Sequence, residues 1–261
     1  MKPVVRDALA VPDAIIRRFG EGETVTDRPE RTIRILCDHE LLALTWTRYE
    51  PGERGPDPHV HHRHVDAFYV LEGELVFGLG PDVEQVRAPA GTFVAAPPNL
   101  VHTFVNKSHG PTFFLNLHAP STGFADNLRG RGSFDSHDPP EDGGRPFSDG
   151  VVLLQGQGEC FENDERVRWV KAEFTELSVL ELEVEPGWTV PAHHHDDHLD
   201  SFYVLDGDVV LTTGNGPVAA STGTLIVAPP GAVHGIRNTG AGRAWLLNMH
   251  APDAGFVARN R

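Results

Sequence analysis

A histidine-rich pattern occurs twice in the chain and constrains its fold and chemistry more than any other feature. His59 and His61 are followed by Asp66 and Gly73, and the same His-x-His-x4-Asp-x6-Gly spacing recurs at 193–207. Alternate residues of an extended strand point to the same side, so each His pair can direct two imidazoles at one point. The Asp follows at a distance that lets the chain bend and return. Because imidazole and carboxylate groups bind transition metals, the sequence predicts two metal sites.

A second motif follows in each half and supplies another His. Residues 91–106 read GTFVAAPPNLVHTFVN, and residues 223–238 read GTLIVAPPGAVHGIRN. In both stretches a Pro-Pro pair fixes the direction of the chain before the His. His102 and His234 can therefore provide a fourth ligand from a neighbouring strand.

The repeat extends over nearly the whole chain. Residues 30–52 run in register with residues 165–187, and both stretches end in Glu-Pro-Gly. A length of 261 residues fits one large domain or two of ordinary size, and the repeat favours two. We expect an N-terminal domain at 1–128, a linker at 129–150 and a C-terminal domain at 151–261. The linker is rich in Gly, Pro, Ser and charge, which is typical of a mobile connection.

Strand patterns fill most of both halves. Alternating apolar runs end at Gly, Pro or Asn turns, and helical periodicity is limited to a turn or two at 8–18. This pattern therefore predicts about eight short strands in each half, arranged as a small antiparallel barrel or jelly roll. Before each His cluster, the alternation directs Thr45, Thr47 and Tyr49 inward in the first half, and Leu180, Leu182 and Val184 in the second. The residues between the latter, Glu181, Glu183 and Glu185, are expected to face water.

Charge and composition restrict the partners. The chain has 22 Lys and Arg against 37 Asp and Glu, and this net charge of −15 argues against nucleic acid or an anionic membrane surface. A small-molecule substrate is the expected partner, and a homo-oligomer stays open. The chain lacks a long apolar run, and Arg6 and Asp7 interrupt the apolar core that a signal peptide needs, so we expect a cytoplasmic protein. Cys37 and Cys160 form no CxxC pair, and we expect neither catalysis nor a disulfide from them.

The motifs resemble those of the cupin superfamily, and their duplication resembles a bicupin. The family's G-x5-H-x-H-x3,4-E-x6-G motif is similar to residues 51–73 and 186–207, and its G-x5-P-x-G-x2-H-x3-N motif to residues 91–106 and 223–238. The resemblance implies a conical double-stranded β-helix in each half. It also implies one divalent transition metal per cupin domain (Fe, Mn, Ni, Co or Zn), held by three His and one carboxylate. Carried over to this sequence, the ligands are His59, His61, Asp66 and His102, then His193, His195, Asp200 and His234.

The sequence departs from the family pattern in two respects. Asn99 stands where the second motif has Gly, and Asn tolerates the left-handed conformation of such a turn. Both halves have Asp where the first motif has Glu. Because Asp is shorter by one methylene, Asp66 and Asp200 act as direct ligands only if their strand lies closer, and otherwise act through water.

Further polar residues accompany each cluster. His64 and His198 precede the Asp by two residues; each could replace the Asp as ligand, act as a pocket base, or lie exposed at the rim of the barrel, the last being favoured. His62 and His194 have the opposite strand parity and are expected to point outward. On the last strand of each half, a polar pair shares one face and either lines the pocket or caps the following turn: Asn116 with His118, and Asn248 with His250.

The cupin fold does not by itself choose a reaction, because it carries dioxygenases, isomerases, decarboxylases and binding proteins. Three neutral His and one carboxylate leave positions open for an oxygen ligand and dioxygen. The leading interpretation is a quercetinase-like or diketone-cleaving dioxygenase of a small aromatic or enolisable carbonyl compound. Its catalytic candidates are Asp66 or His64 as proton acceptor, and Tyr49. The alternatives are a non-redox isomerase or decarboxylase of a small polar metabolite, and a bicupin that binds without turnover.

The two predicted pockets are not equivalent. The hydroxyls of Thr45, Thr47 and Tyr49 can orient a polar substrate, whereas the aliphatic wall of the second half cannot. Phe104 offers an aromatic wall near the fourth ligand, where the second half has Ile236. We therefore expect the first half to turn over a flat, oxygen-bearing substrate.

Overall fold

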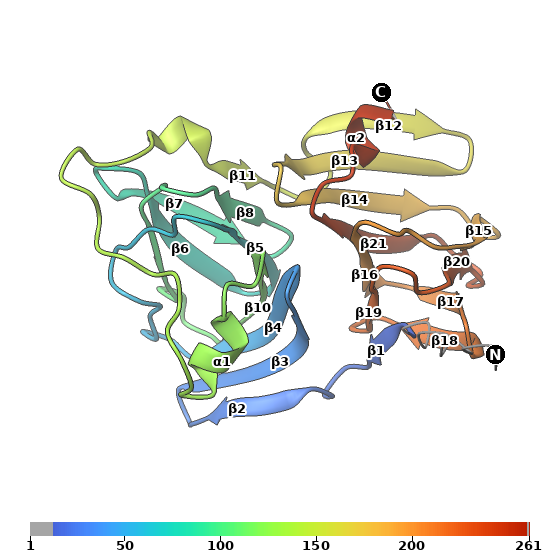
Figure 1. Ribbon diagram of the computed structural model, residues 1–261, viewed down its shortest axis with the longest axis horizontal. Helices are drawn as coiled ribbons and strands as arrows, with labels where there is room; N and C mark the ends of the chain where they lie inside the picture. Colours follow the sequence, from blue (N-terminus) through green and yellow to red (C-terminus); the bar gives the residue numbers. More distant parts are fainter. Residues whose placement is uncertain (1–12, 260) are drawn as a thin grey trace, which may run out of the picture.

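The structure, a computed structural model, describes residues 13–259 and 261. It is built almost entirely of β-strands in two halves, each with one seven-stranded sheet and one smaller sheet facing it (Figure 1). The expected all-β fold is thus confirmed. Within the described residues, the helices are too short to span a bilayer.

The first half has a seven-stranded sheet in the order β11-β8-β5-β10-β4-β3-β2 and a three-stranded sheet in the order β7-β6-β9. All pairings are antiparallel. The strands are β2 (Glu23–Asp27), β3 (Arg31–His39), β4 (Leu42–Tyr49), β5 (Val65–Glu72), β6 (Glu74–Leu79), β7 (Glu84–Pro89), β8 (Phe93–Ala96), β9 (His102–Val105), β10 (Thr112–Ala119) and β11 (Val151–Leu153). Helix α1 (Phe124–Leu128) and the 3₁₀ turn η1 (Phe147–Asp149) lie between β10 and β11.

The second half repeats this arrangement with the order β1-β19-β16-β21-β14-β13-β12 and a four-stranded sheet β15-β20-β17-β18. Its strands are β1 (Ile15–Arg17), β12 (Glu159–Asn163), β13 (Arg166–Glu173), β14 (Ser178–Val184), β15 (Thr189–His193), β16 (Leu199–Asp206), β17 (Asp208–Thr213), β18 (Gly216–Ser221), β19 (Leu225–Ala228), β20 (His234–Asn238) and β21 (Ala244–Ala251). Helix α2 (Phe256–Arg259) follows the last strand.

The two halves exchange their first strands. β1 pairs with β19 of the second half, with Ile15 opposite Val227, and β11 pairs with β8 of the first half, with Val151 opposite Ala95. The helical turn expected at 8–18 is therefore wrong for Ile15–Arg17, and residues 8–12 lie outside the described residues. The predicted division at 128 and 151 stays a prediction about folding units, since backbone hydrogen bonds cross it.

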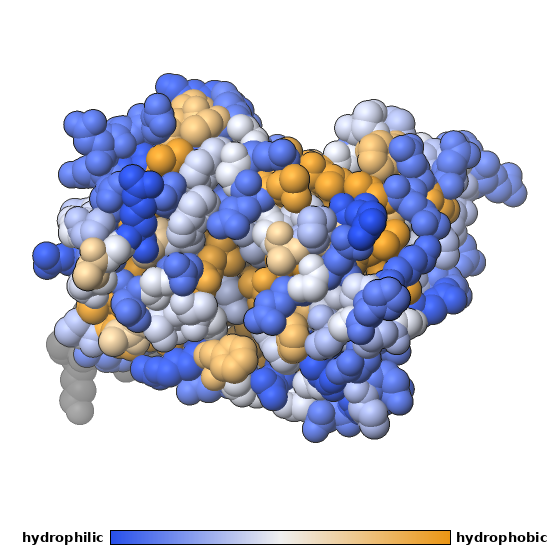
Figure 2. Space-filling view, turned by 180° about the vertical axis from the view of Figure 1, so that it is seen from behind, coloured by the Kyte–Doolittle hydropathy of each residue, from blue (hydrophilic) through white to orange (hydrophobic). Residues whose placement is uncertain are grey.

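Alternate side chains along the strands of the large sheets pack into two different hydrophobic cores. On β5, Phe68 and Val70 point into the first barrel, whereas Ala67 and Tyr69 belong to a cluster that both halves share. Leu247 of the second half lies in that shared cluster. The outer faces of the two large sheets thus pack together and are buried. Figure 2 shows a mainly hydrophilic surface, where the largest hydrophobic group lies in the dip between two lobes.

The shared core explains one wrong expectation. Glu181 is fully buried instead of facing water, and its carboxylate oxygen Oε2 lies 2.9 Å from Nζ of the equally buried Lys171. The loop after β11 covers this face, because Lys171 donates to the carbonyl of Leu154 at 2.7 Å. Glu183 and Glu185 are partly exposed and pair with Arg243, at 2.7 Å each.

The segment 129–150, expected as a linker, packs against the first half along its length. At its start, the Arg129 guanidinium bonds the carboxylates of Glu23 and Asp38. In its middle, His137 and Val60 exchange two backbone hydrogen bonds of 3.0 Å. The segment therefore forms one wall of the first barrel.

Candidate metal centres

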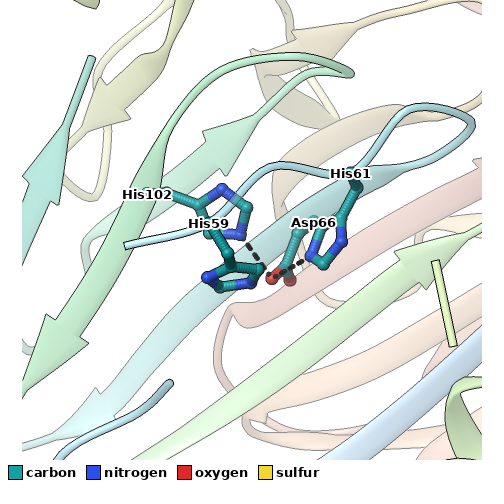
Figure 3. A group of neighbouring side chains, drawn as sticks. All are labelled: His59, His61, Asp66 and His102. Atoms are coloured by element: carbon teal, nitrogen blue, oxygen red, sulfur yellow. Dashed lines mark hydrogen bonds and ion pairs between the residues drawn. The ribbon is translucent and has the colours of Figure 1, made fainter. Parts of the chain in front are cut away.

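The first predicted ligand set converges in the mouth of the first barrel. His59 and His61 come from the loop before β5, Asp66 is the second residue of β5, and His102 begins β9. His59 and His102 are also joined through their backbones, with N–O distances of 3.2 and 3.0 Å. Figure 3 shows the Asp66 carboxylate between the rings of His61 and His102, with His59 beside them. One ligand atom from each residue lies within 4.8 Å of all the others.

Backbone carbonyls fix the rings of the three His. Nδ1 of His59 lies 2.9 Å from the carbonyl of Asp57, and Nδ1 of His102 lies 2.9 Å from that of Leu100. Nδ1 of His61 bonds the carbonyl of Asp135. Because a carbonyl only accepts, each Nδ1 carries the proton and each Nε2 presents a lone pair. This tautomer is the one that binds a metal through Nε2.

The chemistry of the donor set is that of a cation site. Nε2 of His102 lies 3.2 Å and Nε2 of His61 lies 3.5 Å from the same oxygen, Asp66 Oδ2, so acceptors face one another. Nε2 of His61 is buried and has no hydrogen-bond partner in the described part of the chain. Such an unsatisfied buried atom costs about 1 to 3 kcal/mol, which a bound cation would offset. The residues therefore fit a divalent metal.

Asp66 is oriented by a neighbour on β10. Nδ2 of Asn116 donates to Asp66 Oδ1 at 2.5 Å, which leaves Oδ2 toward the His nitrogens. One Asp oxygen thus reaches the common point in spite of the shorter side chain. Its role as a direct ligand stays a prediction.

Electrostatics around His59 also favour its neutral form. Burial, with added repulsion from His102 and His61, lowers the pKa of His59 to about 3. An imidazole that stays neutral throughout the physiological range keeps its lone pair available for a metal.

The second ligand set repeats this geometry in the second barrel. Its four ligand atoms also lie within 4.8 Å of one another. Nε2 of His234 is 3.2 Å and Nε2 of His195 is 3.8 Å from Asp200 Oδ2, while Asn248 donates to Asp200 Oδ1 at 2.6 Å. Nδ1 of His193 and of His234 each lie 2.9 Å from a backbone carbonyl. The structure thus provides two potential three-His, one-Asp sites, one in each half.

The second site is more open than the first. The side chain of His195 is 26% exposed, against 2% for its counterpart His61. Within residues 13–259, Nδ1 of His195 lacks the carbonyl partner that Asp135 gives His61. The difference comes from segment 129–150, which covers only the first site.

Asp135 is the residue that the sequence reasoning missed. Its buried carboxylate oxygen Oδ2 accepts from the backbone N–H groups of His62 and Arg63, at 3.2 and 2.9 Å, and lies 3.1 Å from His64 Nδ1. Burial opposes ionisation, but hydrogen bonds from His137, Arg63 and His64 lower the pKa of Asp135 to about 2.

The neighbouring Phe134 adds an apolar cover to the same site. Its ring packs against the rings of His61, His64 and His118, with centroids 5.1 to 5.3 Å apart. The run Phe-Asp-Ser-His in an otherwise polar linker was the available signal.

The interpretation of His64 and His198 as exposed rim residues is wrong. His64 is fully buried and His198 is 4% exposed. Nε2 of His64 lies 3.0 Å from Nδ1 of His118, and the two form a further His cluster with His61. His64 is buried because Asp135 and Phe134 pack against it. By contrast, His62 and His194 are exposed, as their strand parity predicts.

A cavity of about 560 Å³ adjoins the first cluster. The inward positions expected from parity are confirmed, because Thr45, Thr47 and Tyr49 are buried and line it. Burial raises the pKa of Tyr49 to about 12, so its hydroxyl can donate a hydrogen bond but is not ionised at neutral pH. The remaining walls are largely aromatic, from Phe104, Phe114, Phe124 and Phe134.

The equivalent interior of the second half is packed with apolar side chains. Leu180, Leu182 and Val184 are at most 4% exposed and pack with Trp188 and Ile236 in one cluster. His250 and Asn248 are buried beside Asp200, as His118 and Asn116 are beside Asp66. The Asn and His beside the Asp carboxylate are therefore the same in both halves, whereas the residues that surround each cluster differ.

Comparisons with solved structures support the fold. The formate complex of Lactobacillus farciminis oxalate decarboxylase is 14% identical, with a TM-score of 0.66, over 92% of this chain and 86% of that one. AerE from Microcystis aeruginosa is 14% identical with a TM-score of 0.64, over 92% and 99%. Protein Ylba from E. coli is 11% identical with a TM-score of 0.66, over 92% of each. These identities show a shared fold only. A search of curated proteins gave no match.

The family comparison covers both halves. A model described as "Cupin domain" matches residues 45–118 and again residues 180–250, more than half of the 261 residues. Each match begins on the strand before a His cluster and ends on the last strand of that half, so it encloses one complete ligand set. The chain therefore belongs to the cupin family and carries two cupin domains.

Proposed function

We propose that this bicupin is a metal-dependent enzyme whose first half acts on a ring-sized, oxygen-bearing molecule, and that the reaction is a dioxygenation. One observation carries the proposal: an aromatic-walled cavity of about 560 Å³ adjoins the His59, His61, Asp66 and His102 cluster. Enzyme sites of this kind are mostly apolar with a few convergent polar groups. When bound there, a divalent transition metal would supply Lewis acidity and positions for oxygen ligands.

The chain's own residues would bind and orient the substrate. The rings of Phe104 and Phe114, 5.8 Å apart at their centroids and nearly perpendicular, form an apolar wall that excludes water from a flat substrate. The hydroxyls of Thr45 and Thr47, 3.3 Å apart and buried, offer hydrogen bonds to its polar edge. A substrate without that polar edge would leave them unpaired, at a cost of about 1 to 3 kcal/mol.

A proton released by the substrate has an acceptor path beside the cavity. His118 lines the cavity, and its Nδ1 lies 3.0 Å from Nε2 of His64, which is not itself among the lining residues. His64 would therefore act behind His118 instead of touching the substrate. Asp66, which lines the cavity, is the other acceptor.

The test is oxygen uptake by the metal-loaded chain against a panel of phenols and diketones. We expect turnover that His59→Ala abolishes and that His193→Ala reduces less than about tenfold, since the cavity is in the first half. Absence of oxygen uptake with every loaded metal, or equal losses from the two variants, would contradict the proposal.

A non-redox decarboxylase or isomerase is the second candidate. It is favoured by the buried His64 and His118 pair, which could return a proton to a carbanionic intermediate. The shared fold of an oxalate decarboxylase is consistent with it. Turnover that persists at the same rate under argon would establish this candidate and exclude the dioxygenase.

A further inference from the structure

Arg31 is the single Lys or Arg side chain among the described residues that line the first cavity. It is the first residue of β3, and its guanidinium carbon lies 4.7 Å from the centroid of the Tyr49 ring. The chain carries a net charge of −15, so a cation held at this wall is a local exception that would attract an anionic group.

The guanidinium is held rigidly by three neighbours. Its Nε donates to Glu53 Oε1 at 2.6 Å, and its Nη2 donates to the backbone carbonyl of Arg54 at 2.5 Å. The Tyr49 ring supports its flat face. The third nitrogen, Nη1, makes no hydrogen bond to any described residue. A fixed planar group with free donors is suited to a carboxylate.

Strand register places Arg31 far from the metal cluster along the barrel. Arg31 on β3 pairs with Tyr49 on β4. Four residues earlier on β4, Thr45 pairs with Asn116, whose side chain donates to Asp66 in the metal cluster. At about 3.3 Å per residue, this separation is about 13 Å. A ligand that contacts both Arg31 and the metal cluster must therefore be elongated.

We propose that the first cavity takes an elongated, planar carboxylate, with its oxygen-bearing end at the metal cluster and its carboxylate on Arg31. This inference rests on the proposed function, in that the cavity is the substrate site. A carboxylate is favoured over a phosphate because one cation, already paired with Glu53, offers a single free amino group. A phosphate dianion would need more donors than this wall provides.

The second half contains a matched control. Arg166 begins β13 as Arg31 begins β3, but its guanidinium lies 6.0 Å from the ring of Trp188, which stands where the first half has Glu53. Val184 stands where the first half has Tyr49. Arg166 therefore faces a packed apolar interior.

The experiment uses 3,4-dihydroxycinnamate, whose hydroxyl pair and carboxylate lie at opposite ends, and 3,4-dihydroxycinnamamide as its uncharged match. Binding to the full chain loaded with Zn(II) is measured by calorimetry without oxygen. We expect the carboxylate to bind about tenfold more tightly than the amide. Arg31→Gln should reduce this preference to within about twofold, whereas Arg166→Gln should keep the full preference.

Several outcomes would overturn the inference. One is equal affinity of the native chain for the two probes, and another is a preference that survives in Arg31→Gln. If Arg31→Gln does not fold, Arg31→Lys decides: it keeps the charge without the planar group, so the preference should fall to about threefold, and an unchanged preference overturns the inference. If both probes bind equally while oxygen uptake is found with neutral phenols, the proposed function survives and only the role of Arg31 fails.

Discussion

The two halves have the same strand arrangement, the same three-His, one-Asp cluster and the same Asn and His beside the carboxylate. They differ in the residues that surround the cluster. In the first half, segment 129–150 covers the cluster, and an aromatic cavity lies behind it. In the second half, His195 is partly exposed, and apolar side chains fill the interior. A metal cluster can thus be retained by the fold while its pocket is not. The residues that specify a substrate must therefore be sought in the walls, where the halves differ.

The largest expected effect tests whether the two sites are separate. His59→Ala should weaken metal binding in the first half by more than about 100-fold and leave the second half loaded, because each set lies within its own barrel. His193→Ala should do the converse. Elemental analysis after dialysis gives the metal content per chain, expected to fall from two to one in each variant. If either variant empties both sites, the sites are coupled.

Asp66→Ala distinguishes a direct ligand from a residue that acts through water. Because Asp66 Oδ2 faces two His nitrogens, we expect a loss of first-site metal nearly as large as that of His59→Ala. Competition with a chelator measures the affinity. A loss of only about 10 to 100-fold would instead place a water between Asp66 and the metal.

Asp135→Ala tests the covering segment, which only the first half has. The substitution removes the carboxylate that accepts from His62, Arg63 and His64. The backbone carbonyl of residue 135, which orients the ring of His61, is then held less firmly. We expect the metal affinity of the first site to fall about 10 to 100-fold. The control is Asp197→Ala, since exposed Asp197 bonds His198 in the second half at 2.8 Å. It should change the second-site affinity less than about threefold. Equal effects would show that the covering segment gives no advantage.

The smallest effect concerns acid stability of the metal-free chain. The pKa of His59 falls to about 3 on folding, against about 6.5 in the unfolded chain, so the unfolded state binds more protons between these values. The stability that neutral His59 contributes is therefore present above about pH 6.5 and is lost as pH falls toward 3.

In the second half, burial lowers the pKa of His193. The hydrogen bond between His234 and Asp200 outweighs burial and raises the pKa of His234. These two shifts have opposite effects on stability at low pH. Hydrogen exchange resolved by peptide should show the first half losing protection earlier on acidification. Earlier loss in the second half would refute this assignment.

The sequence predicted which His and Asp side chains converge because the motif is repeated with the same spacing, although His59 and His61 lie in the loop before β5 and not on a strand. Parity also placed Thr45, Thr47 and Tyr49 correctly, since a strand leaves only two choices. The same rule failed for Glu181, because alternation separates two faces but does not say whether the outer face meets water or another part of the chain, here the loop after β11. Asp135 and Arg31 could not be found from spacing, because the partners of Asp135 in the first barrel lie 71 or more residues away and Glu53 lies 22 residues from Arg31. The run at 134–137 was a local signal that the linker is unusual, but the partners of both residues depend on tertiary contacts.

The exchange of β1 and β11 gives the chain the geometry of a domain-swapped dimer joined into one polypeptide. In a dimer of identical subunits, a substitution in one pocket appears in the other as well. Covalent joining removes that constraint, since each pocket is encoded separately, while the swapped strands keep the pair together at a high effective concentration. One half can then lose its cavity and support the fold, while the other half becomes specific for a substrate.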